Sequence, residues 1–214
     1  MCDARGWQVV QLLDAQGIER AILFGHSIGG KAAMATALLY PQRVERLLVL
    51  DMAPADYDVE QCEQWAAIDK VISAMRGLRL EAIRTKGDAD VALSRAVADA
   101  QMRAFILTNL VRTTGASSGD AAAFRWRVNL PAIAAALPAL GRWDVTDAVY
   151  GGNTLFIGAG KSDFLRTSKH LPAIQEQFSR FSLSTIRSAD HWIHADEPEA
   201  LLLIALKFLS VPGA

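Results

Sequence analysis

One strand–helix–strand pattern near the start of the chain constrains its fold more than any other feature. The short apolar runs Ala21–Phe24 and Arg46–Asp51 predict two buried strands. Between them, residues 31–40 are rich in alanine, contain no glycine or proline and end before Pro41, which predicts a helix. A strand, a helix and a strand within about 30 residues form a βαβ unit, so we expect a parallel sheet covered by helices on both faces.

The rest of the chain predicts how this α/β core is organised. We expect a helix over residues 3–16, before the first strand. At the other end of the chain we expect a strand over residues 153–159, a helix over 168–178, a strand over 182–186 and a helix over 197–209. Residues 58–112 carry helical patterning instead, and we interpret the block up to about Leu140 as helical. The predicted organisation is therefore a core of residues 1–54 and 141–214 with a helical cap inserted over residues 55–140.

Composition excludes several classes of protein. The 214 residues are 51% apolar and 21% charged, which is unlike a disordered chain. A net charge of −1 and the lack of any basic run give no reason to expect a nucleic-acid partner. No apolar stretch reaches the roughly 20 residues of a membrane helix, and the acidic residues near the start do not fit a signal peptide, so we expect a cytoplasmic protein. Cys2 and Cys62 lack the spacing of a metal site and are interpreted as two unpaired thiols.

The residues Gly25-His26-Ser27-Ile28-Gly29 match the pattern Gly-x-Ser-x-Gly, directly after a predicted strand and before a predicted helix. In this context the pattern predicts a sharp turn that projects the Ser27 hydroxyl above the sheet, with a strained backbone at the serine. We expect glycine at both ends of the pattern because side chains there would collide with neighbouring elements. The backbone N–H of Ile28 is then the expected donor to an oxyanion.

A serine nucleophile needs a base, and four histidines are candidates. His191 is favoured because it follows the last predicted strand, where α/β sheets place functional groups. His194 is more often structural at the start of a helix, His170 is expected on the surface, and His26 lies inside the turn and faces away from Ser27.

Two carboxylates could orient the base. Asp51 ends the second predicted strand, and Asp163 follows the strand over residues 153–159, so both are expected at the carboxyl edge of the sheet. Either one gives the chain order Ser, Asp, His of α/β-hydrolases. Asp51 is slightly favoured because its strand is the nearer neighbour of the nucleophile strand, and Asp190 is given little weight because it adjoins His191.

Four separated segments carry a resemblance that runs through nearly the whole chain: residues 24–31, 50–57, 124–130 and 191–198. In these segments the sequence resembles the bacterial YbfF-type serine esterases of the α/β-hydrolase superfamily. The resemblance implies a carboxylesterase with a helical cap, with Ser27 as nucleophile and His191 as base, and leaves the choice of acid open. Asp190 departs from it, since a glycine is expected before the base.

The pattern also predicts an incomplete sheet. Only a helix and one strand are expected before Ser27, whereas a full α/β-hydrolase sheet has several strands there, including one that supplies an oxyanion loop. We therefore expect either a fragment of a longer chain or a shortened protein with an open strand edge, through which a homodimer could form.

The expected activity is hydrolysis of carboxylic esters or thioesters of small acyl groups through an acyl-enzyme, with no metal or organic cofactor. Trp192, His26, Phe124 and Trp126 are the candidate substrate-binding residues. Two alternatives remain open. One is a truncated, non-catalytic homologue, and the other is a related chemistry such as that of a C–C hydrolase, lactonase or perhydrolase.

Overall fold

The computed structural model describes residues 4–113 and 124–210, and these divide into two compact units. The first unit combines the chain up to Tyr57 with the chain from Arg142 onward, and the second runs from Asp58 to Gly141. Cys2 lies outside the described residues, and Cys62 is buried.

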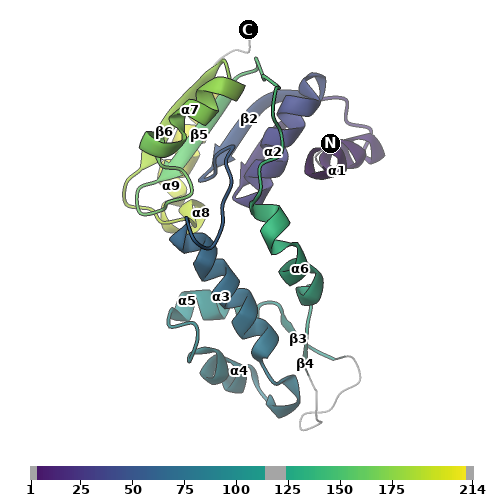
Figure 1. The fold of residues 1–214 in the computed structure, drawn as a ribbon, viewed down its shortest axis with the longest axis vertical. Helices are drawn as coiled ribbons and strands as arrows, with labels where there is room; N and C mark the ends of the chain where they lie inside the picture. Colours follow the sequence, from purple (N-terminus) through teal and green to yellow (C-terminus); the bar gives the residue numbers. More distant parts are fainter. Residues whose placement is uncertain (1–3, 114–123, 211–214) are drawn as a thin grey trace. The chain divides into compact units, whose positions relative to one another are not determined.

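The first unit is a four-stranded parallel sheet with helices on both faces (Figure 1). The strand order is β1-β2-β5-β6, so strands that follow one another within the unit are also neighbours in the sheet. The elements of this unit are α1 (Ala4–Ala15), β1 (Ala21–His26), α2 (Ile28–Leu39), η1 (Pro41–Arg43), β2 (Val44–Leu50), β5 (Thr154–Ala159), α7 (Thr167–Gln177), β6 (Phe181–Ile186), α8 (Ile193–Asp196) and α9 (Pro198–Ser210). The predicted α/β class and parallel sheet are confirmed.

Successive side chains of the central strands point to opposite faces of the sheet. On one face, Leu48, Leu50 and Ile157 form a core with Leu201 and Ala205 of α9. On the other face, Phe156 packs against Phe178, which follows α7, and Val49 lies against Gly30 of α2. Figure 1 shows the same arrangement, with α9 behind the sheet and α7 in front of it. Burial on both faces explains why these strands are nearly continuous apolar runs.

Strand β1 lies at one edge of this sheet. Its side chains Ile22 and Phe24 are 43% and 52% exposed, so the prediction that this strand is buried is wrong for these two residues. They are on the same face as Leu48, since β1 pairs Ile22 with Arg46 and Phe24 with Leu48. The predicted homodimer through this edge stays a prediction, which sedimentation of the Phe24→Lys variant beside the natural chain would test.

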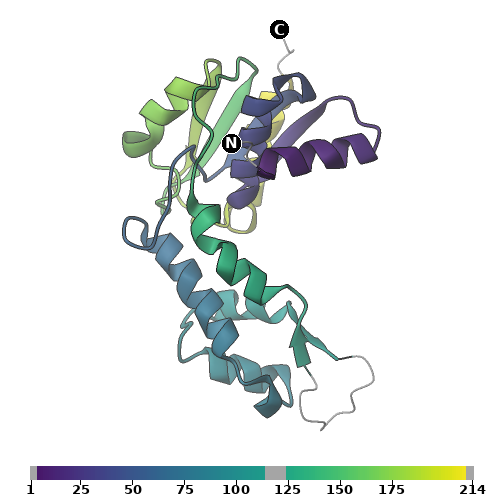
Figure 2. The same ribbon diagram turned by 45° about the vertical axis from the view of Figure 1, so that its right-hand side comes forward.

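The second unit is not wholly helical, which corrects the prediction for the middle of the chain. Strands β3 (Leu110–Arg112) and β4 (Phe124–Trp126) form an antiparallel pair (Figure 2). The other elements are α3 (Glu63–Gly77), η2 (Leu80–Ala82), α4 (Lys86–Leu93), α5 (Ala100–Leu107) and α6 (Leu130–Gly141). Three-residue strands have too little periodicity to be distinguished from a helix end in the sequence, because only their pairing identifies them.

Candidate active site

Ser27 stands between the end of β1 and the start of α2, as the Gly-x-Ser-x-Gly pattern predicts. Its backbone has φ 55° and ψ −126°, a region that non-glycine residues rarely adopt and that costs about 1–3 kcal/mol. The residue after Ser27, Ile28, begins α2, so its N–H belongs to the first helical turn, where backbone N–H groups lack helical acceptors. The turn therefore presents a hydroxyl beside the positive end of a helix dipole.

The two glycines at the ends of the pattern have different roles in this turn. A side chain at Gly25 would overlap the backbone of Gly29 and Gly30, so only glycine fits there. At Gly29, in contrast, an added Cβ meets no atom within 4 Å, so the expected collision there is wrong. The close approach falls one residue later, where a Cβ on Gly30 would lie 3.1 Å from Val49 and 3.2 Å from Met52.

A chain of hydrogen bonds joins Ser27, His191 and Asp51. The Ser27 Oγ lies 3.0 Å from His191 Nε2, and the Asp51 Oδ2 lies 2.8 Å from His191 Nδ1. Because a carboxylate only accepts, Nδ1 carries the proton of a neutral His191, and Nε2 is left with a lone pair for the serine hydroxyl. This is the tautomer that a histidine needs to act as a general base toward Ser27.

The sheet register explains how Asp51 comes to lie near Ser27. Strands β1 and β2 are parallel neighbours with His26 beside Leu50. The residues that follow them, Ser27 and Asp51, therefore lie at the same edge of the sheet. The backbone N–H of Ser27 also donates to the Leu50 carbonyl at 3.1 Å. Asp51 is fully buried and its Oδ1 accepts from the Ala159 N–H at 3.1 Å, so both of its oxygens have partners.

The other acidic candidates lie elsewhere. Asp163 forms an ion pair with Arg166, three residues further along the chain. Asp190 accepts from the backbone N–H of its neighbour His191 at 2.7 Å, so it contacts the backbone of that residue. Of the two favoured carboxylates, Asp51 is therefore the one that contacts the His191 imidazole.

His170 is buried, with 2% of its surface exposed, so its expected surface position is wrong. Its Nδ1 accepts the backbone N–H of Arg166 at 3.1 Å, near the start of α7. Burial, with a smaller contribution from the charge of Lys169, lowers the pKa of His170 to about 4. A neutral imidazole in this position satisfies a helix-terminal N–H that would otherwise lack an acceptor.

His26 lies close to His191, with its Nε2 2.8 Å from the His191 carbonyl oxygen. A carbonyl only accepts, so Nε2 of His26 donates. Burial, together with the nearby His191, lowers the pKa of His26 to about 4, so this ring is neutral at pH 7. Its ring centroid is 4.6 Å from that of His191 and 5.5 Å from that of Trp192.

The remaining candidates are distributed over both units. Trp192 is half-buried beside the His191 ring, at a centroid distance of 5.8 Å. Phe124 is a buried core residue of the second unit with Arg112 over its ring, and Trp126 lines a hollow of about 380 Å³ in that unit. Their assignment to substrate binding stays a prediction. Phe164, whose ring centroid is 4.4 Å from that of His191, was missed because nothing in the sequence sets it apart from other core aromatics.

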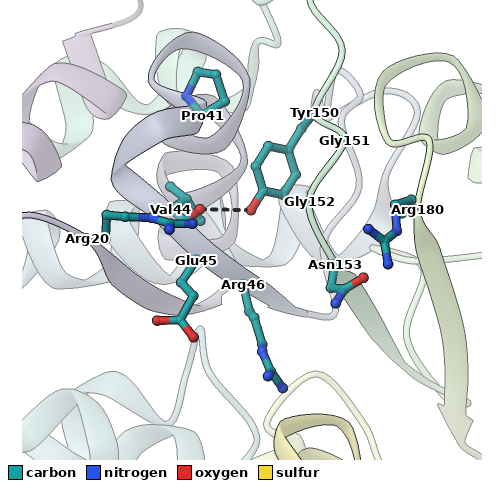
Figure 3. A pocket seen from close by; sticks show the side chains of 10 residues that line it. All are labelled: Arg20, Pro41, Val44, Glu45, Arg46, Tyr150, Gly151, Gly152, Asn153 and Arg180. Atoms are coloured by element: carbon teal, nitrogen blue, oxygen red, sulfur yellow. Dashed lines mark hydrogen bonds between the residues drawn. The ribbon is translucent and has the colours of Figure 1, made fainter. Parts of the chain in front are cut away.

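A second hollow, of about 420 Å³, lies at the amino ends of the strands in the first unit (Figure 3). Its wall includes Arg20 before β1, Val44 at the start of β2, Asn153 before β5 and Arg180 before β6. Ser27, His191 and Asp51 follow the carboxyl ends of strands, so this hollow is at the opposite edge of the sheet from them.

Two further observations concern metal binding and membrane-spanning helices. Within residues 4–113 and 124–210, no three His, Cys, Asp or Glu side chains gather in a way that could hold a metal ion. In the described part of the chain, no helix combines the length and the apolar character needed to cross a membrane.

Residues 3–198 match the family model of the alpha/beta hydrolase fold. The chain is 34% identical over 203 residues to the mouse sn-1-specific diacylglycerol lipase ABHD11, covering 93% of this chain and 62% of that protein. It is 28% identical over 207 residues to the Escherichia coli esterase YbfF, covering 97% of this chain and 74% of that one. A solved marine microorganism esterase matches with a TM-score of 0.87 and 28% identity, covering 95% of this chain and 75% of that chain. The chain therefore spans about three fifths to three quarters of the length of these relatives.

Proposed function

This chain belongs to the alpha/beta hydrolase fold family, and on that premise we propose that it is a serine hydrolase that cleaves carboxylic esters or thioesters of small acyl groups. The observation that carries the proposal is the hydrogen-bonded series Ser27, His191 and Asp51, at 3.0 and 2.8 Å. The names of the similar mouse and E. coli proteins, a lipase and an esterase, support the same class of substrate.

In the proposed reaction, Ser27 Oγ attacks the carbonyl carbon of the ester while His191 Nε2 takes the hydroxyl proton. The carbonyl oxygen becomes an oxyanion, which the N–H of Ile28 stabilises; one such donor is worth about 2.7–4 kcal/mol. When the tetrahedral intermediate collapses, His191 gives the proton to the departing alkoxide or thiolate, and an acyl-Ser27 ester remains.

The second half of the reaction repeats the same steps with water. His191 removes a proton from water, the hydroxide adds to the acyl carbon, and Ser27 leaves with the proton restored. The buried Asp51 stabilises the imidazolium form of His191 in both halves and holds the ring in the required tautomer. Trp192, beside the base, is the residue of the first unit proposed to contact the acyl group.

The test is hydrolysis of p-nitrophenyl acetate and butyrate by the natural chain beside Ser27→Ala, with circular dichroism to establish that both are folded. We expect a Ser27-dependent rate and labelling of Ser27 by a fluorophosphonate. Equal rates for the two folded proteins would contradict the proposal and favour a non-catalytic homologue. If Ser27 is labelled but the nitrophenyl esters are not cleaved, lactones and β-diketones would distinguish the related chemistries of this fold.

A further inference from the structure

His26 makes a contact that ordinary substrate binding does not require. It is the residue before the nucleophile, and its Nε2 donates to the backbone carbonyl of His191, 165 positions further along the chain. The bond length of 2.8 Å is that of a well-formed hydrogen bond. This side chain therefore connects the strand that carries the nucleophile directly to the backbone that carries the base.

The segment that holds His191 has no regular structure of its own, since it lies between the end of β6 and the start of α8. Its backbone is held from two sides. On one side, the Ala189 carbonyl accepts from the N–H of Lys161, after β5, at 3.0 Å. On the other side, the His191 carbonyl accepts from His26. The Asp190 N–H also donates to Asp196 Oδ2, at 2.9 Å. The bond to Asp51 orients the imidazole ring, whereas these backbone bonds locate the segment from which the ring projects.

We propose that His26 is a positioning residue that places the general base, by holding the His191 carbonyl against the strand that ends at Ser27. The inference rests on the proposed function, in which His191 must reach the Ser27 hydroxyl. The Nε2–Oγ distance is 3.0 Å, so a shift of about 1 Å in the backbone at His191 would break this hydrogen bond. A misplacement of that size in a catalytic group costs about 100-fold in rate.

The protonation state of His26 suits this role. With a pKa of about 4, the ring is neutral at pH 7, and its one N–H is the proton that Nε2 donates to His191. During the proposed reaction His191 becomes an imidazolium, and a second positive charge at a centroid distance of 4.6 Å would oppose that step. A neutral donor locates the base without this electrostatic cost, which a lysine or arginine at position 26 would impose.

The experiment compares His26→Phe, which keeps an aromatic ring but has no donor, with His26→Gln, whose amide can donate to the same carbonyl. His194→Phe is the matched control, since the His194 ring also packs on His26 (centroids 5.1 Å apart) but is exposed. On p-nitrophenyl butyrate we expect His26→Phe to lose about 100-fold in kcat with KM changed less than threefold. His26→Gln should recover at least tenfold of that loss, and His194→Phe should stay within threefold of the natural chain.

A second measurement works without turnover. Proton NMR of the natural chain should show a downfield signal from the His191 Nδ1–H bonded to Asp51, assigned by its loss in Asp51→Asn. We expect this signal in His26→Gln and its broadening or loss in His26→Phe. An unchanged signal and an unchanged kcat in folded His26→Phe would overturn the positioning role. If instead the natural chain shows no Ser27-dependent turnover, the proposed function fails and the NMR comparison still decides the role of His26.

Discussion

Asp51 and His191 are 140 positions apart in the sequence, yet the Asp51 Oδ2 lies 2.8 Å from the His191 Nδ1. The carboxylate is fully buried, and its second oxygen accepts the backbone N–H of Ala159. A buried carboxylate with hydrogen bonds at both oxygens is fixed in direction, which is what an orienting acid requires.

Asp51→Asn should therefore lower kcat for p-nitrophenyl butyrate by about 10⁴-fold, because an amide favours the wrong tautomer of His191. Asp163→Asn is the matched control. It removes the ion pair with Arg166 and should change kcat less than fivefold. An equal or larger loss in Asp163→Asn would assign the acid to Asp163 instead.

Gly25→Ala and Gly29→Ala should differ sharply although both glycines belong to one pattern. A Cβ at residue 25 overlaps the backbone of the helix start, so we expect Gly25→Ala to be insoluble or to lose more than about 4 kcal/mol of stability. A Cβ at residue 29 meets open space within α2, and alanine favours helix over glycine by up to about 1 kcal/mol. Urea unfolding followed by circular dichroism measures both, and equal destabilisation by the two variants would contradict the structure of the turn.

Ser27→Gly should be more stable than the natural chain while losing activity. Glycine adopts φ 55° without the steric cost that serine bears, so we expect a gain of about 1 kcal/mol in the free energy of unfolding. Ser27→Ala keeps a Cβ at the same angle and provides the matched comparison. A Ser27→Gly protein no more stable than Ser27→Ala would show that the backbone here is not strained.

Stability should fall in mild acid through His170. Its pKa is about 4 in the folded chain and about 6.5 when unfolded, so between these values the unfolded chain binds the extra proton. The contribution of His170 to the free energy of unfolding should thus be constant above pH 7 and fall by about 2–3 kcal/mol as the pH approaches 4. His26, whose pKa is also about 4, should add a decline of its own.

His170→Asn tests this pH dependence, since asparagine can still accept from the Arg166 N–H but does not titrate. Urea midpoints at several pH values between 4 and 8 should show a shallower decline for this variant than for the natural chain. Parallel declines would mean that other groups account for the acid sensitivity.

The sequence was sufficient for the order of the core elements and for the residue types at their ends. Apolar runs such as residues 46–50 and 153–159 predict buried strands because a strand covered on both faces needs apolar residues throughout. The carboxyl edge of a parallel sheet collects the loops after its strands, which is why Ser27 and His191 could be singled out together.

Other features depended on contacts between distant segments, which local periodicity does not predict. The register of β1 with β2 places Asp51 near Ser27, where its carboxylate meets His191, whereas Asp163 pairs with Arg166, although both residues follow a predicted strand. The β3–β4 pairing, the burial of His170 and the bond from His26 to the His191 carbonyl were likewise decided in three dimensions. The α/β class and the chemical groups at the sheet edge thus follow from the residues and their order. Which of these groups meet depends on the packing of distant segments, because hydrogen-bond partners are selected by distances of about 3 Å that no local pattern encodes.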